Sequence, residues 1–79
     1  MVQLQQVVNQ VQALAGESVT VYVENSGKQE AYSGYLGGYR WDKESGFVEV
    51  FCAGGVATIR EGDAWHIEVW TQPENWERL

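Results

Sequence analysis

Apolar residues recur along the first fifteen positions at the spacing of an α-helix. Within residues 2–15 they form one stripe, made of Leu4, Val7, Val8, Val11, Leu14 and Ala15. Gly16 follows, and glycine commonly ends a helix because it tolerates the left-handed backbone conformation there. The pattern predicts a helix over residues 2–15. Its other face is uncharged and carries amides that can both donate and accept hydrogen bonds: Gln3, Gln5, Gln6, Asn9, Gln10 and Gln12.

Beyond Gly16 the apolar period falls to two residues, which is the repeat of a β-strand. Val19, Val21 and Val23 alternate with polar residues, and further apolar runs follow. The predicted strands occupy residues 19–23, 31–41, 47–51, 56–59 and 64–70. Turn-forming residues lie between them, at 25–27, 42–46, 54–55 and 60–63.

The second predicted strand contains Gly34, Gly37 and Gly38, which indicate a bend or the close approach of another backbone. Pro73 then ends the sheet. We predict a mainly β single domain over residues 1–79. It has an N-terminal α-helix, a strongly bent five-stranded antiparallel sheet or small SH3-like barrel, and a polar C-terminal tail with Trp76, in the ranges 2–15, 18–70 and 71–79. A helix packed on an open antiparallel sheet would show similar periodicities.

Size and composition favour assembly with other chains. A 79-residue domain buries little surface, so disulfides, metals or oligomerisation usually add stability. The single Cys52 excludes an internal disulfide, and the single His66 gives no zinc-ligand spacing. The predicted strand at 65–70 lacks the lysine or proline that commonly blunts a sheet edge. We therefore expect the chain to pair with other copies of itself.

The net charge of −6, from 11 acidic and five basic residues, disfavours non-specific binding to a phosphate backbone. No apolar run approaches the roughly 20 residues of a membrane span, and the chain does not open like a signal peptide. We expect a cytoplasmic protein with no cofactor. We also expect no enzyme, because one histidine, one cysteine and the turn acids Asp42, Glu44, Glu61 and Asp63 assemble no acid–base pair, nucleophile or metal set.

Two motifs, in order behind an amphipathic helix, carry a family resemblance. The first reads Val19-x-Val21-x-Val23, then Gly34-x-Leu36 and Tyr39; the second reads Ile59-Arg60-Glu61-Gly62-Asp63, then Trp65-x-Ile67. From about Leu4 to Trp70 the chain resembles the Sm/LSm family of small β-barrels, which includes the bacterial Hfq proteins. That family continues its first motif into Asp-x-x-Met-Asn. Here Asp42 matches the aspartate, whereas Gly46 stands where the base-holding asparagine belongs and Glu61 is inserted beside Arg60.

The resemblance implies a homo-oligomeric ring of about five to seven subunits, in which the last strand pairs with the fourth strand of the next subunit. The interface residues it implies are Val56, Thr58, Trp65, Ile67, Val69 and Trp70. Candidate ligand-binding residues supply positive charge, stacking surfaces and hydrogen bonds: Arg60, Arg40, Tyr39, Trp41, Asp42, Gln6 and Gln10.

Two functions follow as hypotheses. The first is a non-catalytic, ring-forming Sm-like binding protein that holds a small polar ligand, a nucleotide or single-stranded RNA. The alternative is a small acidic inhibitor of phage or mobile-element type, which would imitate nucleic-acid charge or cover a basic target protein. Salt dependence distinguishes them, because an acidic mimic loses its basic partner steeply as salt rises.

Overall fold

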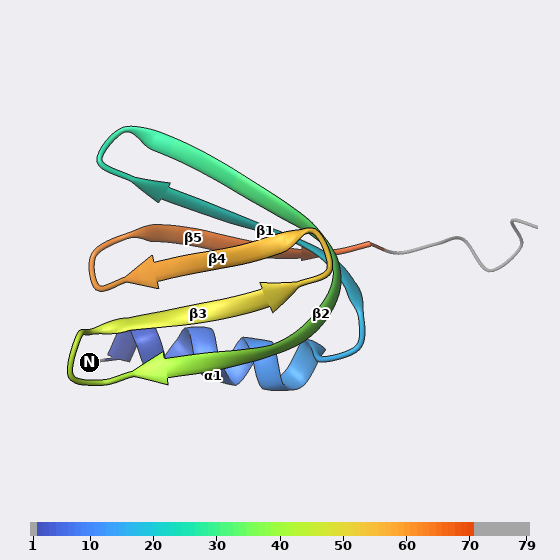
Figure 1. The fold of residues 1–79 in the computed structure, drawn as a ribbon, viewed down its shortest axis with the longest axis horizontal. Helices are drawn as coiled ribbons and strands as arrows, with labels where there is room; N and C mark the ends of the chain where they lie inside the picture. The colour runs from blue at the N-terminus through green and yellow to red at the C-terminus, as the bar shows by residue number, and fades with distance from the viewer. Residues whose placement is uncertain (1, 71–79) are drawn as a thin grey trace, which may run out of the picture.

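The computed structural model describes residues 2–70, and residue 1 and the tail at 71–79, including Trp76, lie outside the described residues. One helix, α1 (Val2–Leu14), precedes a single antiparallel sheet (Figure 1). The strands are β1 (Ser18–Asn25), β2 (Lys28–Asp42), β3 (Phe47–Cys52), β4 (Gly55–Arg60) and β5 (Ala64–Val69). The predicted helix and bent five-stranded antiparallel sheet are confirmed, and the sheet is not closed.

The helix ends one residue before the predicted end, at Leu14. Gly16 adopts a positive φ of 89°, and its N–H donates to the carbonyl of Leu36 on β2 at 2.8 Å. The Glu17 N–H bonds back to the carbonyl of Leu14 at 3.0 Å, which satisfies one of the carbonyls that a helix end leaves open. This turn directs the chain from α1 into β1.

The apolar stripe of α1 packs on the concave side of the sheet, where one core forms. Its members come from α1 and all five strands: Leu4, Val7, Val8, Val11, Val19, Val21, Val23, Leu36, Val48, Val50, Ala57, Ile59 and Ile67. Alternation therefore determined which side of each strand faces inward.

β2 is one continuous strand of 15 residues that bends through both halves of the sheet. Its first half pairs with β1, its second half pairs with β3, and the β3 register shifts between Leu36 and Gly38. At Gly34, with φ of 133°, the turn between β3 and β4 packs directly on the backbone of β2. The predicted bend with a close backbone approach is confirmed at this glycine.

The strand order is β4-β3-β2-β1-β5, so β4 and β5 form the two edges of the sheet. They follow one another in the chain through a tight corner, at which the Asp63 N–H donates to the Arg60 carbonyl at 3.1 Å. Each edge strand has one neighbour within residues 2–70: β3 for β4, and β1 for β5. None of the helical segments in that range has the length and apolarity needed to cross a bilayer.

Candidate binding surfaces and edge strands

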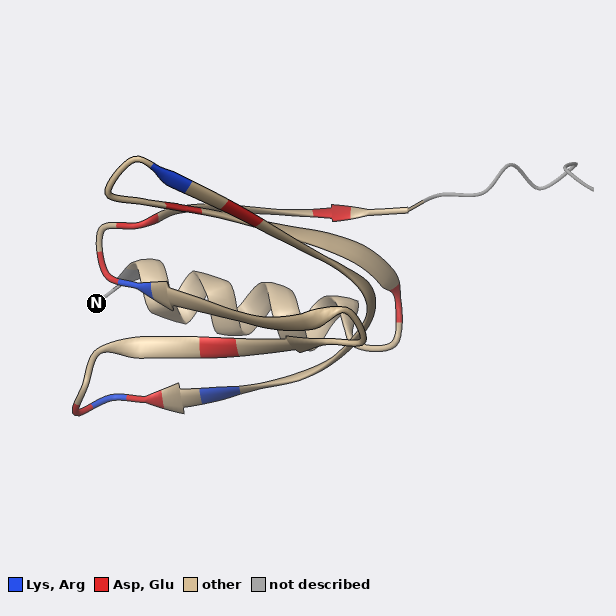
Figure 2. Ribbon diagram, turned by 45° about the horizontal axis from the view of Figure 1, so that its top comes forward, with Lys and Arg blue, Asp and Glu red and all other residues tan. Residues whose placement is uncertain are grey.

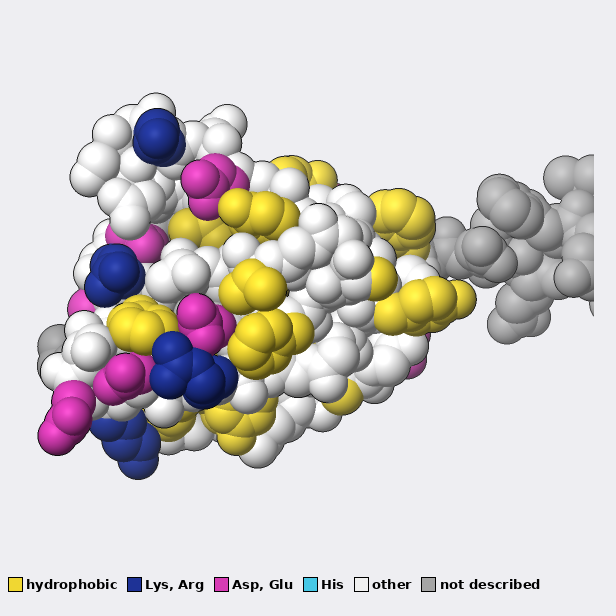
Figure 3. All heavy atoms as spheres, viewed as in Figure 1, with side chains coloured by type: hydrophobic (Ala, Val, Ile, Leu, Met, Phe, Trp, Pro, Cys, Tyr) yellow, Lys and Arg dark blue, Asp and Glu magenta, His cyan; other side chains and the backbone are white. Residues whose placement is uncertain are grey.

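Two arginines converge on one aromatic ring on the outer face of β2, β3 and β4. The register places Arg60 opposite Phe47, and Arg40 opposite Glu49 two residues further along β3. The guanidinium carbons of Arg40 and Arg60 lie 5.4 Å and 5.3 Å from the centroid of the Phe47 ring, within cation–π range. We call these three residues the Phe47 face. Figure 3 shows hydrophobic, basic and acidic side chains interleaved on this side of the molecule.

The two arginines differ in their electrostatic surroundings. Arg40 Nε donates to Glu49 Oε1 at 2.7 Å, and an Arg40 Nη lies 3.9 Å from Asp42 Oδ2. The hydrogen bond to Glu49 and its charge raise the pKa of Arg40. Arg60 has no ion pair with any residue in the range 2–70. Its guanidinium is therefore the cation on this face that remains available to an anion.

The sheet separates Tyr39 and Trp41 from the arginines. Both are partly buried and pack against the core, because they alternate with Arg40 along β2. The Gln12 amide of α1 donates to the Tyr39 hydroxyl at 3.2 Å, and the Lys43 ammonium lies 4.7 Å from the Trp41 ring centroid. The candidate ligand residues thus divide between two faces.

Asp42 acts in the turn after β2. Its Oδ1 accepts the N–H of Ser45 at 3.0 Å, which stabilises the predicted turn at 42–46. Gln6 and Gln10 are both exposed on α1. Gln6 shares a shallow surface beside β5 with Asp63, Ala64 and Trp65, whereas Gln10 lies about one turn further along α1.

The expected interface residues lie on the two edge strands. On β4, Val56 is 43% exposed and Thr58 is partly buried. On β5, Ile67 belongs to the core and Trp65 packs against it, whereas Val69 is 37% exposed. The edges thus have both apolar side chains and backbone groups that face away from the sheet.

Trp70 follows β5 and closes a short hydrogen-bonded chain. Its backbone N–H donates to the Ser18 carbonyl at 2.8 Å, and its indole N–H donates to the Thr20 hydroxyl at 2.7 Å. That hydroxyl lies 2.9 Å from the Ser33 hydroxyl on β2. Trp70 is nevertheless 55% exposed, so it also offers an aromatic surface.

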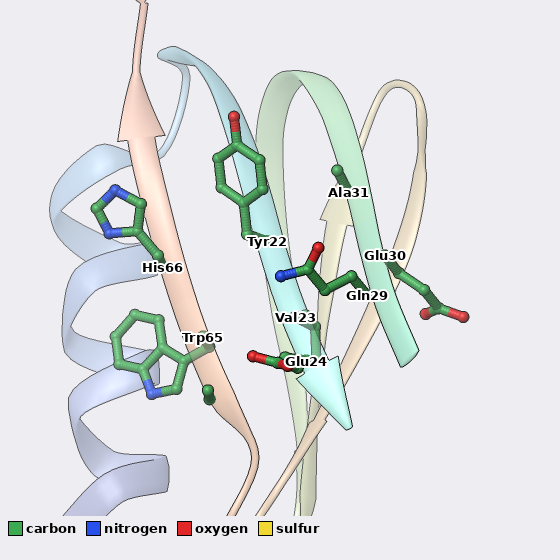
Figure 4. A pocket seen from close by; sticks show the side chains of 9 residues that line it. Tyr22, Val23, Glu24, Gln29, Glu30, Ala31, Trp65 and His66 are labelled. Carbon is green, nitrogen blue, oxygen red and sulfur yellow. The ribbon is translucent and has the colours of Figure 1, made fainter. Parts of the chain in front are cut away.

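A trough of about 390 Å³ lies over β5, β1 and the start of β2 (Figure 4). We call it the acidic trough, because Glu24 points into it and no lysine or arginine of residues 2–70 lines it. The other lining residues are Tyr22, Val23, Gln29, Glu30, Ala31, Ala64, Trp65 and His66. Glu30 lies opposite core-facing Val23, so its carboxylate points to the other side of β2. The rings of Tyr22 and His66 are stacked, with centroids 6.0 Å apart. The Tyr22 hydroxyl donates to Glu68 at 3.3 Å, and the Glu68 charge raises the pKa of Tyr22.

The acidic trough was not among the sites predicted from the sequence. The sequence did indicate the part of the trough that β1 contributes, because Tyr22 and Glu24 occupy the polar positions of the alternating first strand. The contribution of β5 depended on the register Tyr22–His66 and Glu24–Ala64, which joins segments about forty residues apart.

A second groove, of about 320 Å³, separates the edge of β4 from the β1–β2 hairpin. Lys28, Glu30 and Arg60 supply its charges. Lys28 and Arg60 are two of the four lysines and arginines within residues 2–70. Figure 2 colours these residue types blue along the chain. The β4 side of the molecule is therefore more basic than the β5 side.

Groups for covalent or metal chemistry are sparse within residues 2–70. Among them, no three histidine, cysteine, aspartate or glutamate side chains gather closely enough to hold a metal ion. Cys52 is a partly buried free thiol, and burial raises its pKa, which disfavours the nucleophilic thiolate.

Comparison with protein-family models, with curated proteins and with solved structures found no match for this chain.

Proposed function

We propose that this chain is a non-catalytic, self-assembling binding protein of the Sm-like type. Copies would join head to tail through β4 and β5 into a closed ring of about five to seven subunits. The observation that carries the proposal is the pair of edge strands at opposite ends of one strongly bent, open sheet. Both strands have six residues, so each edge matches the length of the other.

Edge strands expose backbone hydrogen-bonding groups and are usually blunted, covered or paired. β4 and β5 contain no proline and no lysine, and within residues 2–70 each pairs on one side only. Pairing of β4 with β5 of the next copy would satisfy both edges with a single type of contact. A head-to-tail contact of this kind forms a ring when its rotation closes.

The ligand part of the proposal rests on the Phe47 face. The Arg40 guanidinium over the Phe47 ring suits a ligand that combines an anion with a flat ring, such as a nucleotide or single-stranded RNA. Glu49 and Asp42 offset part of this positive charge, so a weak site is expected. The free thiol of Cys52 is compatible with the cytoplasmic location proposed for the chain.

Fluorescence anisotropy with a labelled 12-nucleotide RNA, and with a labelled ATP analogue, tests the ligand part. We expect Arg40→Gln to weaken binding about threefold to tenfold, as loss of one charged contact does. Tyr39→Phe, on the other side of β2, should leave affinity unchanged and serves as the matched control. Absence of binding to both probes at about 100 µM protein and moderate salt would refute the ligand part.

A protein-directed inhibitor is the second candidate, and the acidic trough is the observation that favours it. Glu24 there has no ion pair within residues 2–70, and the aromatic rings of Tyr22 and His66 line the same trough. Such a trough would take a lysine or arginine of a basic target. The inhibitor hypothesis predicts a monomer whose affinity for that target falls steeply as the salt concentration rises.

A further inference from the structure

The two edge strands have charges of opposite sign. The charged residue of β4 is Arg60, and that of β5 is Glu68. The acidic trough beside β5 adds Glu24. Neither Arg60 nor Glu24 forms an ion pair with any residue of the described chain. One edge therefore offers an uncompensated cation, and the other offers the uncompensated carboxylate of Glu24.

Strand length and pleat favour one register between β4 of one copy and β5 of another. Full antiparallel overlap of two six-residue strands puts Arg60 opposite Ala64. In the same register Ala57 lies opposite Ile67, and both are core residues. A slip by one residue would turn the buried side of one strand toward the exposed side of the other. Full overlap thus pairs all six residues and keeps one continuous core face.

This register brings Arg60 of one copy to the mouth of the acidic trough of the next. Ala64 pairs with Glu24 across β5 and β1, so Glu24 lies one strand beyond Ala64 on the same face. Adjacent strands are about 4.8 Å apart, which places Arg60 and Glu24 roughly 10 Å apart between their Cα atoms. An arginine and a glutamate side chain bridge that span together, and the methyl group of Ala64 leaves room between them.

We propose that Arg60 of each copy enters the acidic trough of the next copy, passes over Ala64 and pairs with Glu24. This contact rests on the proposed assembly through β4 and β5. Its two side chains, Arg60 and Glu24, are the groups that select the partner edge. Tyr22 and His66 provide aromatic rings beside the path of the guanidinium. Arg40 would then remain alone over Phe47, as the ligand-facing cation.

The same charges disfavour a two-fold arrangement. If β5 of one copy paired with β5 of another, the two acidic troughs would face each other, and like charges across paired strands are destabilising. Pairing β4 with β5 brings opposite charges together instead. The contact therefore selects a head-to-tail assembly over an isologous dimer.

Charge exchange tests the contact. Size exclusion with light scattering, over a dilution series, would measure the oligomeric state of four proteins. These are the wild-type full chain, Arg60→Glu, Glu24→Arg and the double variant. Each single variant should raise the concentration at which the assembly dissociates by about tenfold or more, because it places like charges together. The double variant should restore the wild-type behaviour. Glu17→Arg makes the same charge change in an exposed loop and should resemble the wild type.

All altered residues are exposed, so far-ultraviolet circular dichroism should show the native fold for every variant. If the wild type assembles and both single variants dissociate no more readily than Glu17→Arg, the Arg60–Glu24 contact is wrong while the assembly stands. The contact is also wrong, while the assembly stands, if both single variants dissociate more readily and the double variant does not regain the wild-type behaviour. A wild type that stays monomeric at every concentration overturns the proposed assembly, and the contact with it. Binding of the trough to an unrelated basic protein by a monomeric chain would also overturn it.

Discussion

Gly34 of β2 lies so close to Ala53 that a Cβ at position 34 would come within 2.8 Å of the Ala53 Cβ. Ala53 also donates its N–H to the Tyr35 carbonyl at 3.0 Å, so the β3–β4 turn is held against the bend of β2. This contact places β4 where the long second strand folds over, and it therefore positions one of the two sheet edges.

Gly34→Ala should destabilise the fold by about 2 kcal/mol or more, because it combines a steric overlap with a backbone conformation that favours glycine. Gly37→Ala is the matched control: it lies in the same strand, its added Cβ would be 3.5 Å from the nearest atom, the Phe51 carbonyl oxygen, and its φ is not positive. Urea unfolding followed by circular dichroism measures both. Equal stability of the two variants would contradict the role assigned to Gly34.

The hydrogen bond from the Trp70 indole to Thr20 should contribute about 1 kcal/mol to the free energy of unfolding. Trp70→Phe keeps an aromatic ring but removes the N–H donor. A double-mutant cycle with Thr20→Val, measured by urea unfolding, isolates the pair energy. A coupling energy near zero would show that Trp70 and Thr20 act independently.

Tyr22 should titrate above its ordinary pKa of 10.0, because the Glu68 carboxylate opposes a second negative charge. A raised folded-state pKa favours the neutral phenol, so its stabilising contribution is present below pH 10 and is lost as pH rises through the folded-state pKa. Carbon-13 NMR of the tyrosine ring would follow this titration. Glu68→Gln should lower the pKa of Tyr22, and an unchanged titration would refute the Tyr22–Glu68 interaction.

A disulfide trap tests the proposed register between copies. In a Cys52→Ser background, Thr58→Cys and His66→Cys together would place cysteines opposite each other across β4 and β5 of neighbouring copies. Opposite residues in antiparallel strands have Cα atoms about 4.5–5.5 Å apart, which suits a disulfide. Mild oxidation should give a ladder of covalent oligomers on a non-reducing gel. Thr58→Cys with Glu68→Cys, two residues out of register, should give far less, and equal ladders would contradict full overlap.

Local patterns accounted for most of the secondary structure. Residues such as Val19, Val21 and Val23 show the period of the strand directly, and Gly16 marks the end of the helix. The continuous course of β2 from Lys28 to Asp42 was underestimated at its start, where polar residues stand in a hairpin that extends from the core. Exposed strand residues give little hydrophobic signal, so pairing with β1 maintains strand structure there.

The candidate surfaces depended on contacts that a linear pattern does not contain. Arg40 and Arg60 meet at Phe47 only through the registers of β2 with β3 and β3 with β4. The separation of Tyr39 from Arg40, in contrast, could have been predicted, since neighbouring residues of a strand face opposite sides. The acidic trough required the pairing of β1 with β5, which joins residues distant in the chain.

Assembly through the two sheet edges is the central claim, and native mass spectrometry of the purified chain, without crosslinker and at near-physiological salt, tests it most directly. We predict one closed species of about five to seven subunits, with any bound ligand visible as extra mass. A spectrum that contains only monomer, at concentrations well above those of weak self-association, would contradict the account.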